Sequence, residues 1–208
     1  GVSVSMSAGT ATVEGYDIFS GIDGVFGSSF ADQILGDAGS NVIKAGAGND
    51  YVSGGAGDDV VYDGSGSDTV DGGSGNDVIV SAADGESDKF DGGVGFDIVD
   101  YSEAKTSITV NFVNGLTDGE VGKDKLFNIE GVIGGSGDDQ LLGSKGNEML
   151  NGGAGDDLIQ GGRGYDVLTG GEGSDTFVFA RNDVQTGVNY YGFDTITDFG
   201  AGDRLDFS

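Results

Sequence analysis

The stretch that decides the fold is residues 45–80, which reads AGAGNDYVS (45–53), GGAGDDVVY (54–62), DGSGSDTVD (63–71) and GGSGNDVIV (72–80). The four nine-residue units share Gly at positions two and four, Asp at position six, and Val or Ile at position eight. A fixed period of this kind is the sequence signature of a repeat architecture. The rest of the chain is therefore best examined in the same nine-residue register.

The period extends well beyond these four units. It runs without a gap from Ile18 to Val80 and, after two inserted residues, continues through 83–91 and 92–100. A second array of six units runs from Lys125 to Val178. Position six is occupied by Asp23, Asp32, Asn41, Asp50, Asp59, Asp68, Asp77, Asp88 and Asp97, then by Glu130, Asp139, Glu148, Asp157, Asp166 and Asp175. Position eight is occupied by Val25, Ile34, Ile43, Val52, Val61, Val70, Ile79, Phe90 and Val99, then by Val132, Leu141, Leu150, Ile159, Leu168 and Phe177.

The period predicts the path of the backbone. Each unit divides into a six-residue turn, whose glycines allow positive φ, and a three-residue strand, whose middle side chain faces inward. The glycine content and the nine-residue spacing exclude a helix. Two units complete one coil. We therefore expect an all-β fold, a parallel β-roll in which two facing sheets enclose a thin apolar core.

Composition limits the partners that the protein can have. The 208 residues include 44 Gly and no Pro, Cys or His, and 36 acidic against 9 basic residues give a net charge of −27. Such a charge opposes compaction unless something cancels it. It excludes nucleic acid as a partner and disfavours an anionic membrane, because both attract basic surfaces. No apolar run approaches the ~20 residues that span a bilayer.

Stacking the units creates an electrostatic problem. Coils in such a roll lie about 4.8 Å apart, and alternate units share an edge, so Asp50 stacks between Asp32 and Asp68. Two bare carboxylates at that distance repel by about 3–4 kcal/mol at an effective dielectric constant near 20. Several such pairs would exceed the ~5–15 kcal/mol stability of a typical domain. We therefore expect cations between the turns, and the oxygen-only donors favour Ca²⁺ over Mg²⁺. The alternative is that Asp merely favours tight turns.

Units 45–80 and 152–178 resemble the RTX (repeats-in-toxin) nonapeptide G-G-x-G-x-D-x-U-x, where U is apolar. The resemblance implies a right-handed parallel β-roll that binds Ca²⁺ between turns n and n+2, through backbone carbonyls and the position-six Asp. The first implied ligand set is Ala45, Ala47, Asp50, Gly64, Gly66 and Asp68, and the second is Gly54, Ala56, Asp59, Gly73, Gly75 and Asp77. The third is Gly134, Ser136, Asp139, Gly153, Gly155 and Asp157, and the fourth is Gly152, Ala154, Asp157, Gly171, Gly173 and Asp175. Asp32 is a further expected ligand.

Several turns depart from the repeat. Asn41 is neutral, and Glu130 and Glu148 are one methylene longer than Asp. Turns 27–32 (GSSFAD) and 83–88 (ADGESD) lack the regular glycines. The repeat pattern therefore leaves calcium sites at these turns open.

We expect five segments along the chain. They are a β-hairpin leading into the roll (1–17), a first array (18–100), an inserted β-hairpin (101–124), a second array (125–178) and a C-terminal cap (179–208). The cap resembles the end of such rolls in secreted metalloproteases and alginate epimerases. That resemblance implies a module of a larger, secreted bacterial protein that leaves the cell through type I secretion machinery.

Two functional hypotheses follow. We expect no enzyme activity, because the acids are in phase with the repeat and His and Cys are absent. The first hypothesis is a calcium-gated module that folds outside the cell. The second is a module that binds an acidic extracellular polysaccharide such as alginate, through Lys125, Lys145 and Arg163 in turns of alternate units. These cations would equally compensate for missing calcium beside Glu130 and Glu148.

Overall fold

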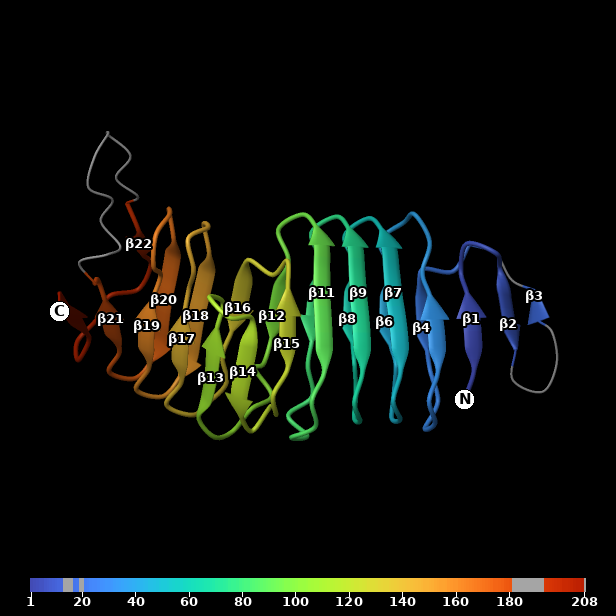
Figure 1. Ribbon diagram of the computed structural model, residues 1–208, viewed down its shortest axis with the longest axis horizontal. Coiled ribbons are helices and arrows are strands. Elements are labelled where there is room, and N and C mark those ends of the chain that lie inside the picture. The colour runs from blue at the N-terminus through green and yellow to red at the C-terminus, as the bar shows by residue number, and fades with distance from the viewer. Residues whose placement is uncertain (13–16, 19–20, 181–192, 208) are drawn as a thin grey trace. The chain divides into compact units, whose positions relative to one another are not determined.

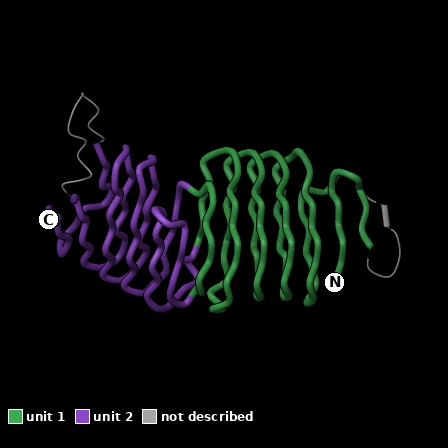
Figure 2. The backbone as a smooth tube through the Cα atoms, in the orientation of Figure 1, with its two compact units in different colours: residues 1–100, 121–129 green, residues 101–120, 130–208 purple. Residues whose placement is uncertain are grey.

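The computed structural model describes residues 1–12, 17–18, 21–180 and 193–207. Every regular element within these residues is a β-strand (Figure 1). The described residues contain no helix long and apolar enough to cross a membrane. The chain divides into two compact units (Figure 2). Unit 1 comprises residues 1–100 and 121–129, and unit 2 comprises residues 101–120 and 130–208.

Unit 1 is built from two sheets that receive successive repeats in turn. One sheet contains β4 (Gly24–Phe26), β6 (Val42–Lys44), β8 (Val60–Tyr62), β10 (Val78–Val80) and β12 (Ile98–Asp100). The other contains β5 (Gln33–Leu35), β7 (Tyr51–Ala56), β9 (Thr69–Ser74), β11 (Lys89–Val94) and β15 (Lys125–Phe127). Neighbouring strands are parallel, and Tyr51 pairs with Thr69 two repeats later. Two repeats therefore complete one coil, and the predicted parallel β-roll is confirmed.

Unit 2 repeats this arrangement with fewer coils. One sheet contains β16 (Gly131–Ile133), β18 (Met149–Ala154), β20 (Val167–Glu172) and β22 (Thr195–Ile196). The other contains β13 (Ile108–Asn111), β17 (Gln140–Leu142), β19 (Leu158–Gln160), β21 (Thr176–Val178) and β23 (Arg204–Asp206). In this second sheet the successive pairs β13–β17, β17–β19, β19–β21 and β21–β23 are all parallel.

Antiparallel hairpins accompany the parallel strands. In unit 1, β1 (Ser3–Ser5) pairs antiparallel with β2 (Thr10–Thr12), which pairs in turn with β3 (Asp17–Ile18). In unit 2, β13 pairs antiparallel with β14 (Leu116–Gly119). Each hairpin also joins the roll of its own unit, because β1 is parallel to β5 and β13 is parallel to β17.

The core of each unit is formed mainly by the position-eight side chains, which come from both sheets. Those with no exposed surface are Ile34, Ile43, Val52, Val61, Val70, Ile79, Phe90 and Val99 in unit 1, and Val132, Leu141, Leu150, Ile159, Leu168 and Phe177 in unit 2. Their neighbours in sequence point outward because side chains alternate along a strand. One buried side chain per repeat makes a thin core, which leaves the turns a large part in determining stability.

The turns depend on glycine at positions two and four. Gly55 and Gly57 have φ values of 111° and 97°, a region that residues with a Cβ rarely adopt. A Cβ on Gly55 would also collide with the backbone carbonyl of Asp37 in the preceding coil. The same glycines that bend the chain therefore allow successive turns to approach closely.

The thin core predicts unequal effects within β11, where Phe90 is fully buried and Val94 is 73% exposed. Phe90→Ala should lower the free energy of unfolding by about 3–5 kcal/mol, because it opens a cavity among the buried position-eight side chains. Val94→Ala, the matched control, should change it by less than about 0.5 kcal/mol. Urea unfolding of both variants in saturating calcium measures the difference, and equal losses would show that position eight does not form the core.

Candidate functional site

The position-six aspartates form a hydrogen-bonded ladder along each edge of the roll. The backbone N–H of one position-six residue donates to Oδ1 of the position-six Asp in the next turn on that edge. The pairs predicted to share an ion all follow this rule: Asp50 with Asp68 at 2.7 Å, Asp59 with Asp77 at 2.8 Å, Asp139 with Asp157 at 2.7 Å and Asp157 with Asp175 at 3.0 Å. The ladder fixes each carboxyl group through one of its two oxygens.

The second carboxylate oxygen is the chemically important one. Among the described residues it is buried without a hydrogen-bond partner in Asp50, Asp59, Asp68, Asp77, Asp157, Asp166 and Asp175, as is Oε2 of Glu148. A buried charged oxygen with no partner costs several kcal/mol unless a counter-charge reaches it. Each of these oxygens therefore marks a position along the edge where a cation could bind.

Glycine at position one keeps a small space beside this oxygen. A Cβ built on Gly54 would lie 2.6 Å from the carbonyl oxygen of Gly72 and would collide with Oδ2 of Asp59. Gly152 shows the same relation to Gly170, at 2.7 Å, and to Asp157. The space is lined by carboxylate and carbonyl oxygens, the hard donors that Ca²⁺ prefers. The donor set therefore fits calcium.

Burial makes these carboxyl groups hard to ionise. It raises the pKa of Asp59 to about 6, with the charge of Asp77 adding to the effect. It raises the pKa of Asp157 to about 7, with the charges of Asp139 and Asp175 adding further. Burial likewise raises the pKa of Asp50, Asp77 and Asp175 above the usual value. Without a cation the stacked aspartates thus oppose one another.

Each of the four predicted ligand sets lies on two turns that are neighbours in the stack. In the first set, Ala47 forms a parallel bridge with Ser65, which lies between Gly64 and Gly66 in the next turn. In the second and fourth sets, Gly55 pairs with Gly73, and Gly153 pairs with Gly171. The carbonyl ligands assigned to these turns stay predictions, but the structure brings the turns that carry them together.

Two predicted ligands differ from the others. Both oxygens of Asp139 accept backbone hydrogen bonds, from Ile108 at 2.9 Å and from Gly135 at 2.8 Å. Asp32 accepts from Val2 and from both the amide and hydroxyl of Ser28. Burial acts to raise the pKa of Asp32, but these hydrogen bonds outweigh it and the pKa is lowered. Asp32 and Asp139 therefore lack the unpartnered oxygen of the regular turns.

The sequence-based prediction placed the start of the second array incorrectly. Lys125, expected in a turn, lies in strand β15 of unit 1. The ladder residue here is Asp124, which is fully buried and accepts the backbone N–H of Asp88 at 2.9 Å. The signal was present, because Asp124–Phe127 matches the D-x-U-x end of a unit, but Asp124 lies six residues before Glu130 and so falls outside the nine-residue register of the array that begins at Lys125. Lys145 and Arg163 do lie in stacked turns, since Arg163 N–H donates to the Ser144 carbonyl at 3.1 Å.

The ladder also continues into the C-terminal segment. The backbone N–H of Asp166 donates to Asp194 at 3.1 Å, and that of Asp175 donates to Asp203 at 3.0 Å. Asp194 and Asp203 each begin a D-x-U-x sequence whose strand, β22 or β23, joins the roll. Sequence reasoning treated this segment as a cap and missed that it supplies further position-six carboxylates.

Comparison with known families identifies the repeat. The family model of the RTX calcium-binding nonapeptide repeat (4 copies) matches residues 26–61, 50–79, 62–99, 132–159 and 151–183. The matches together cover more than half of the chain and fall in both units. A comparison with curated proteins found no match.

The raised pKa values predict that acid stabilises the calcium-free fold. The pKa is about 6 for Asp59 and Asp68 and about 7 for Asp157, against 3.8 for the ordinary carboxyl, so the folded chain binds protons more tightly than the unfolded chain. The free energy of unfolding should therefore be highest below about pH 4 and fall as the pH rises to about 7. Far-UV circular dichroism of dialysed, metal-free protein between pH 8 and pH 4 should show a gain of β-structure. A loss of β-structure on acidification would contradict the prediction.

Proposed function

The chain belongs to the family of RTX calcium-binding nonapeptide repeats, and from this premise we propose that it is a calcium-gated folding module of a larger secreted protein. The repeats of this family bind Ca²⁺, and the proposal gives them a structural role and not a catalytic one. One observation supports the gating: the ladder aspartates carry buried oxygens with no hydrogen-bond partner. Burial of these groups in the ionised form is costly unless a cation neutralises them.

The geometry of the ladder explains how the residues cooperate. The backbone N–H from the preceding turn holds Oδ1 of each aspartate, which leaves Oδ2 as the oxygen available to a cation. Asp157 donates to one neighbour and accepts from the other, so each ladder position is tied to two more. Ordering one turn therefore helps to order the next. Bound calcium supplies the positive charge that allows the carboxylates to stack.

The thermodynamics suit a switch between compartments. At the low free calcium of a cytosol, repulsion within a chain of net charge −27 would keep it extended and competent for type I export. Outside the cell, each site filled at 100 times its dissociation constant adds about 2.7 kcal/mol to the folded state. Two to five such sites would supply the ~5–15 kcal/mol of a typical domain, so folding would follow secretion.

A paired substitution in the turn of residues 54–59 tests the role of position six. Asp59 is 1% exposed and Asp58, beside it, is exposed. Asp59→Asn should lower the free energy of unfolding in saturating calcium by about 2–3 kcal/mol, because it removes one charge from a calcium site. Asp58→Asn removes the same charge and should change the value by less than about 0.5 kcal/mol.

The measurement is a calcium titration followed by far-UV circular dichroism, with magnesium as the control cation. The wild-type chain should pass cooperatively from coil to β-structure with calcium and not with magnesium, and Asp59→Asn should need more calcium than Asp58→Asn. A chain that is fully β-structured in chelator at pH 7.5 would refute calcium gating.

Acidic polysaccharide binding is a second candidate, supported by the stacking of the turns that carry Lys145 and Arg163. Lys125 is not part of this pair, since it lies in a strand of the other unit. If the pair meets uronate carboxylates, Lys145→Ala/Arg163→Ala should weaken binding of alginate by about fivefold. Lys105→Ala, an exposed lysine in the same unit, is the control for charge. Calorimetry in saturating calcium measures both variants, and equal affinities would remove this candidate.

A further inference from the structure

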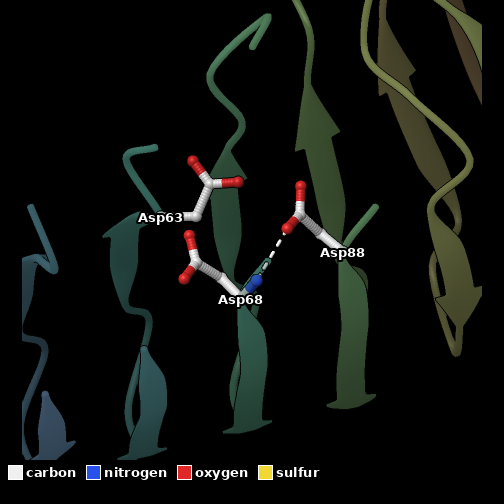
Figure 3. Close-up of side chains that lie close together, drawn as sticks. All are labelled: Asp63, Asp68 and Asp88. Atoms are coloured by element: carbon white, nitrogen blue, oxygen red, sulfur yellow. Dashed lines mark hydrogen bonds between the residues drawn. The ribbon is translucent and has the colours of Figure 1, made fainter. Parts of the chain in front are cut away.

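A cluster of three carboxyl groups in unit 1 breaks the pattern of the ladder. Asp63 and Asp68, the first and last residues of turn 63–68, converge with Asp88 of turn 83–88 (Figure 3), and each offers one oxygen that lies within 4.8 Å of the other two. Their exposed fractions are 1%, 3% and 4%. Asp68 and Asp88 are ordinary ladder residues, joined by the Asp68 N–H that donates to Asp88 Oδ1 at 2.7 Å. Asp63 is the additional acid.

Asp63 occupies position one, where the neighbouring units have Gly54 and Gly72. Its Oδ1 accepts two backbone hydrogen bonds, from Gly64 at 2.6 Å and from Ala82 at 2.9 Å. Its Oδ2 is buried and has no hydrogen-bond partner. The side chain is thus held firmly through one oxygen, while the other is left for a ligand that neither the protein backbone nor another side chain provides.

The turn opposite Asp63 explains why a third acid is needed. In turn 83–88, positions two and four are Asp84 and Glu86, and neither has a positive φ. The regular contact between turns is therefore lost. Where Gly48 N–H donates to the carbonyl of Ser65, Gly66 N–H donates to the side chain of Asp84 at 2.7 Å. The irregular turn thus meets its neighbour through a carboxylate and not through a carbonyl, and Asp63 places a further carboxylate beside it.

The two inserted residues, Ser81 and Ala82, give the side chain its place. The ladder step from Asp68 to Asp88 spans 20 residues, whereas that from Asp50 to Asp68 spans 18. The neighbouring regular turns carry only a small residue at position one, Gly or Ala45, and a Cβ on Gly72 would lie 2.6 Å from the Gly92 carbonyl. Beside Asp63 the inserted Ala82 contributes a hydrogen-bond donor instead. The insertion and the extra acid thus belong to one local arrangement.

We propose that Asp63, Asp68 and Asp88 together bind one Ca²⁺ ion, and bind it more tightly than the regular two-aspartate turns. The proposal rests on the calcium binding of the repeats and adds to one pair of position-six aspartates a third carboxylate, Asp63, that the nine-residue pattern does not contain. Three buried carboxylates concentrate a formal charge of −3, and affinity for Ca²⁺ rises with the number of charged ligands. Asp84 and Asp124 add negative charge around Asp88. Oxygen donors alone favour a hard cation.

The test compares two charge-matched variants. Asp63→Asn keeps an oxygen for the amides of Gly64 and Ala82 but removes the charge from the cluster. Asp71→Asn removes one charge from strand β9 of the same repeat, outside the cluster. Calcium binding is measured at pH 7.5 by competition with a chromophoric chelator, and equilibrium dialysis counts the ions bound. Circular dichroism at saturating calcium confirms that each variant is folded.

The wild-type chain should bind one ion at least about tenfold more tightly than the remainder. Asp63→Asn should lose this tight phase, and Asp71→Asn should keep it. If Asp63→Asn fails to fold, Asp63→Gly, which restores the residue of the neighbouring repeats, serves instead and should lose the same phase. A tight phase that survives both position-63 substitutions, or a wild-type chain without one, overturns the proposal. A wild-type chain that binds calcium without gaining β-structure would refute gated folding, yet the variant comparison would still decide this site.

Discussion

The repulsion between carboxylates stacked at the spacing of neighbouring strands is the constraint on which the whole roll depends. Each repeat buries an apolar side chain at position eight, and most repeats bury an acid at position six. The first contribution is small, and the second is unfavourable until a cation arrives. Under the proposed calcium gating, the metal sites supply the stability that the thin core does not, and this would allow a chain with net charge −27 to have a regular fold.

The backbone and the acids are coupled through the ladder. Glycines with positive φ, such as Gly55 and Gly57, bring successive turns close enough for a backbone N–H to reach the next aspartate. That hydrogen bond holds one carboxylate oxygen and leaves the other buried without a hydrogen-bond partner. Turn geometry, strand register and cation binding are thus coupled. This coupling is the reason that we expect folding to be cooperative.

Departures from the repeat show how strict this coupling is. In the turn of Asp32 the serine at position two supplies hydrogen bonds to the carboxylate, and its pKa falls. At the start of the second roll the amides of Ile108 and Gly135 satisfy Asp139. Beside turn 83–88 no such compensation of the charge is seen, and Asp63 instead adds a third carboxyl group to the two position-six aspartates. Among the described residues, Asp32 and Asp139 thus have both carboxylate oxygens hydrogen-bonded, whereas the regular ladder aspartates keep one oxygen without a hydrogen-bond partner.

The sequence by itself determined the period, the all-β parallel roll, the core at position eight and the acids at position six, because each follows from spacing within one repeat. Only the tertiary structure decided which oxygens lack partners, that Lys125 lies in a strand and Asp124 in the ladder, and that Asp63 meets Asp88. These contacts join residues from different coils. They depend on how an insertion or an irregular turn shifts one coil against the next, and a period read along the chain carries no information about that shift.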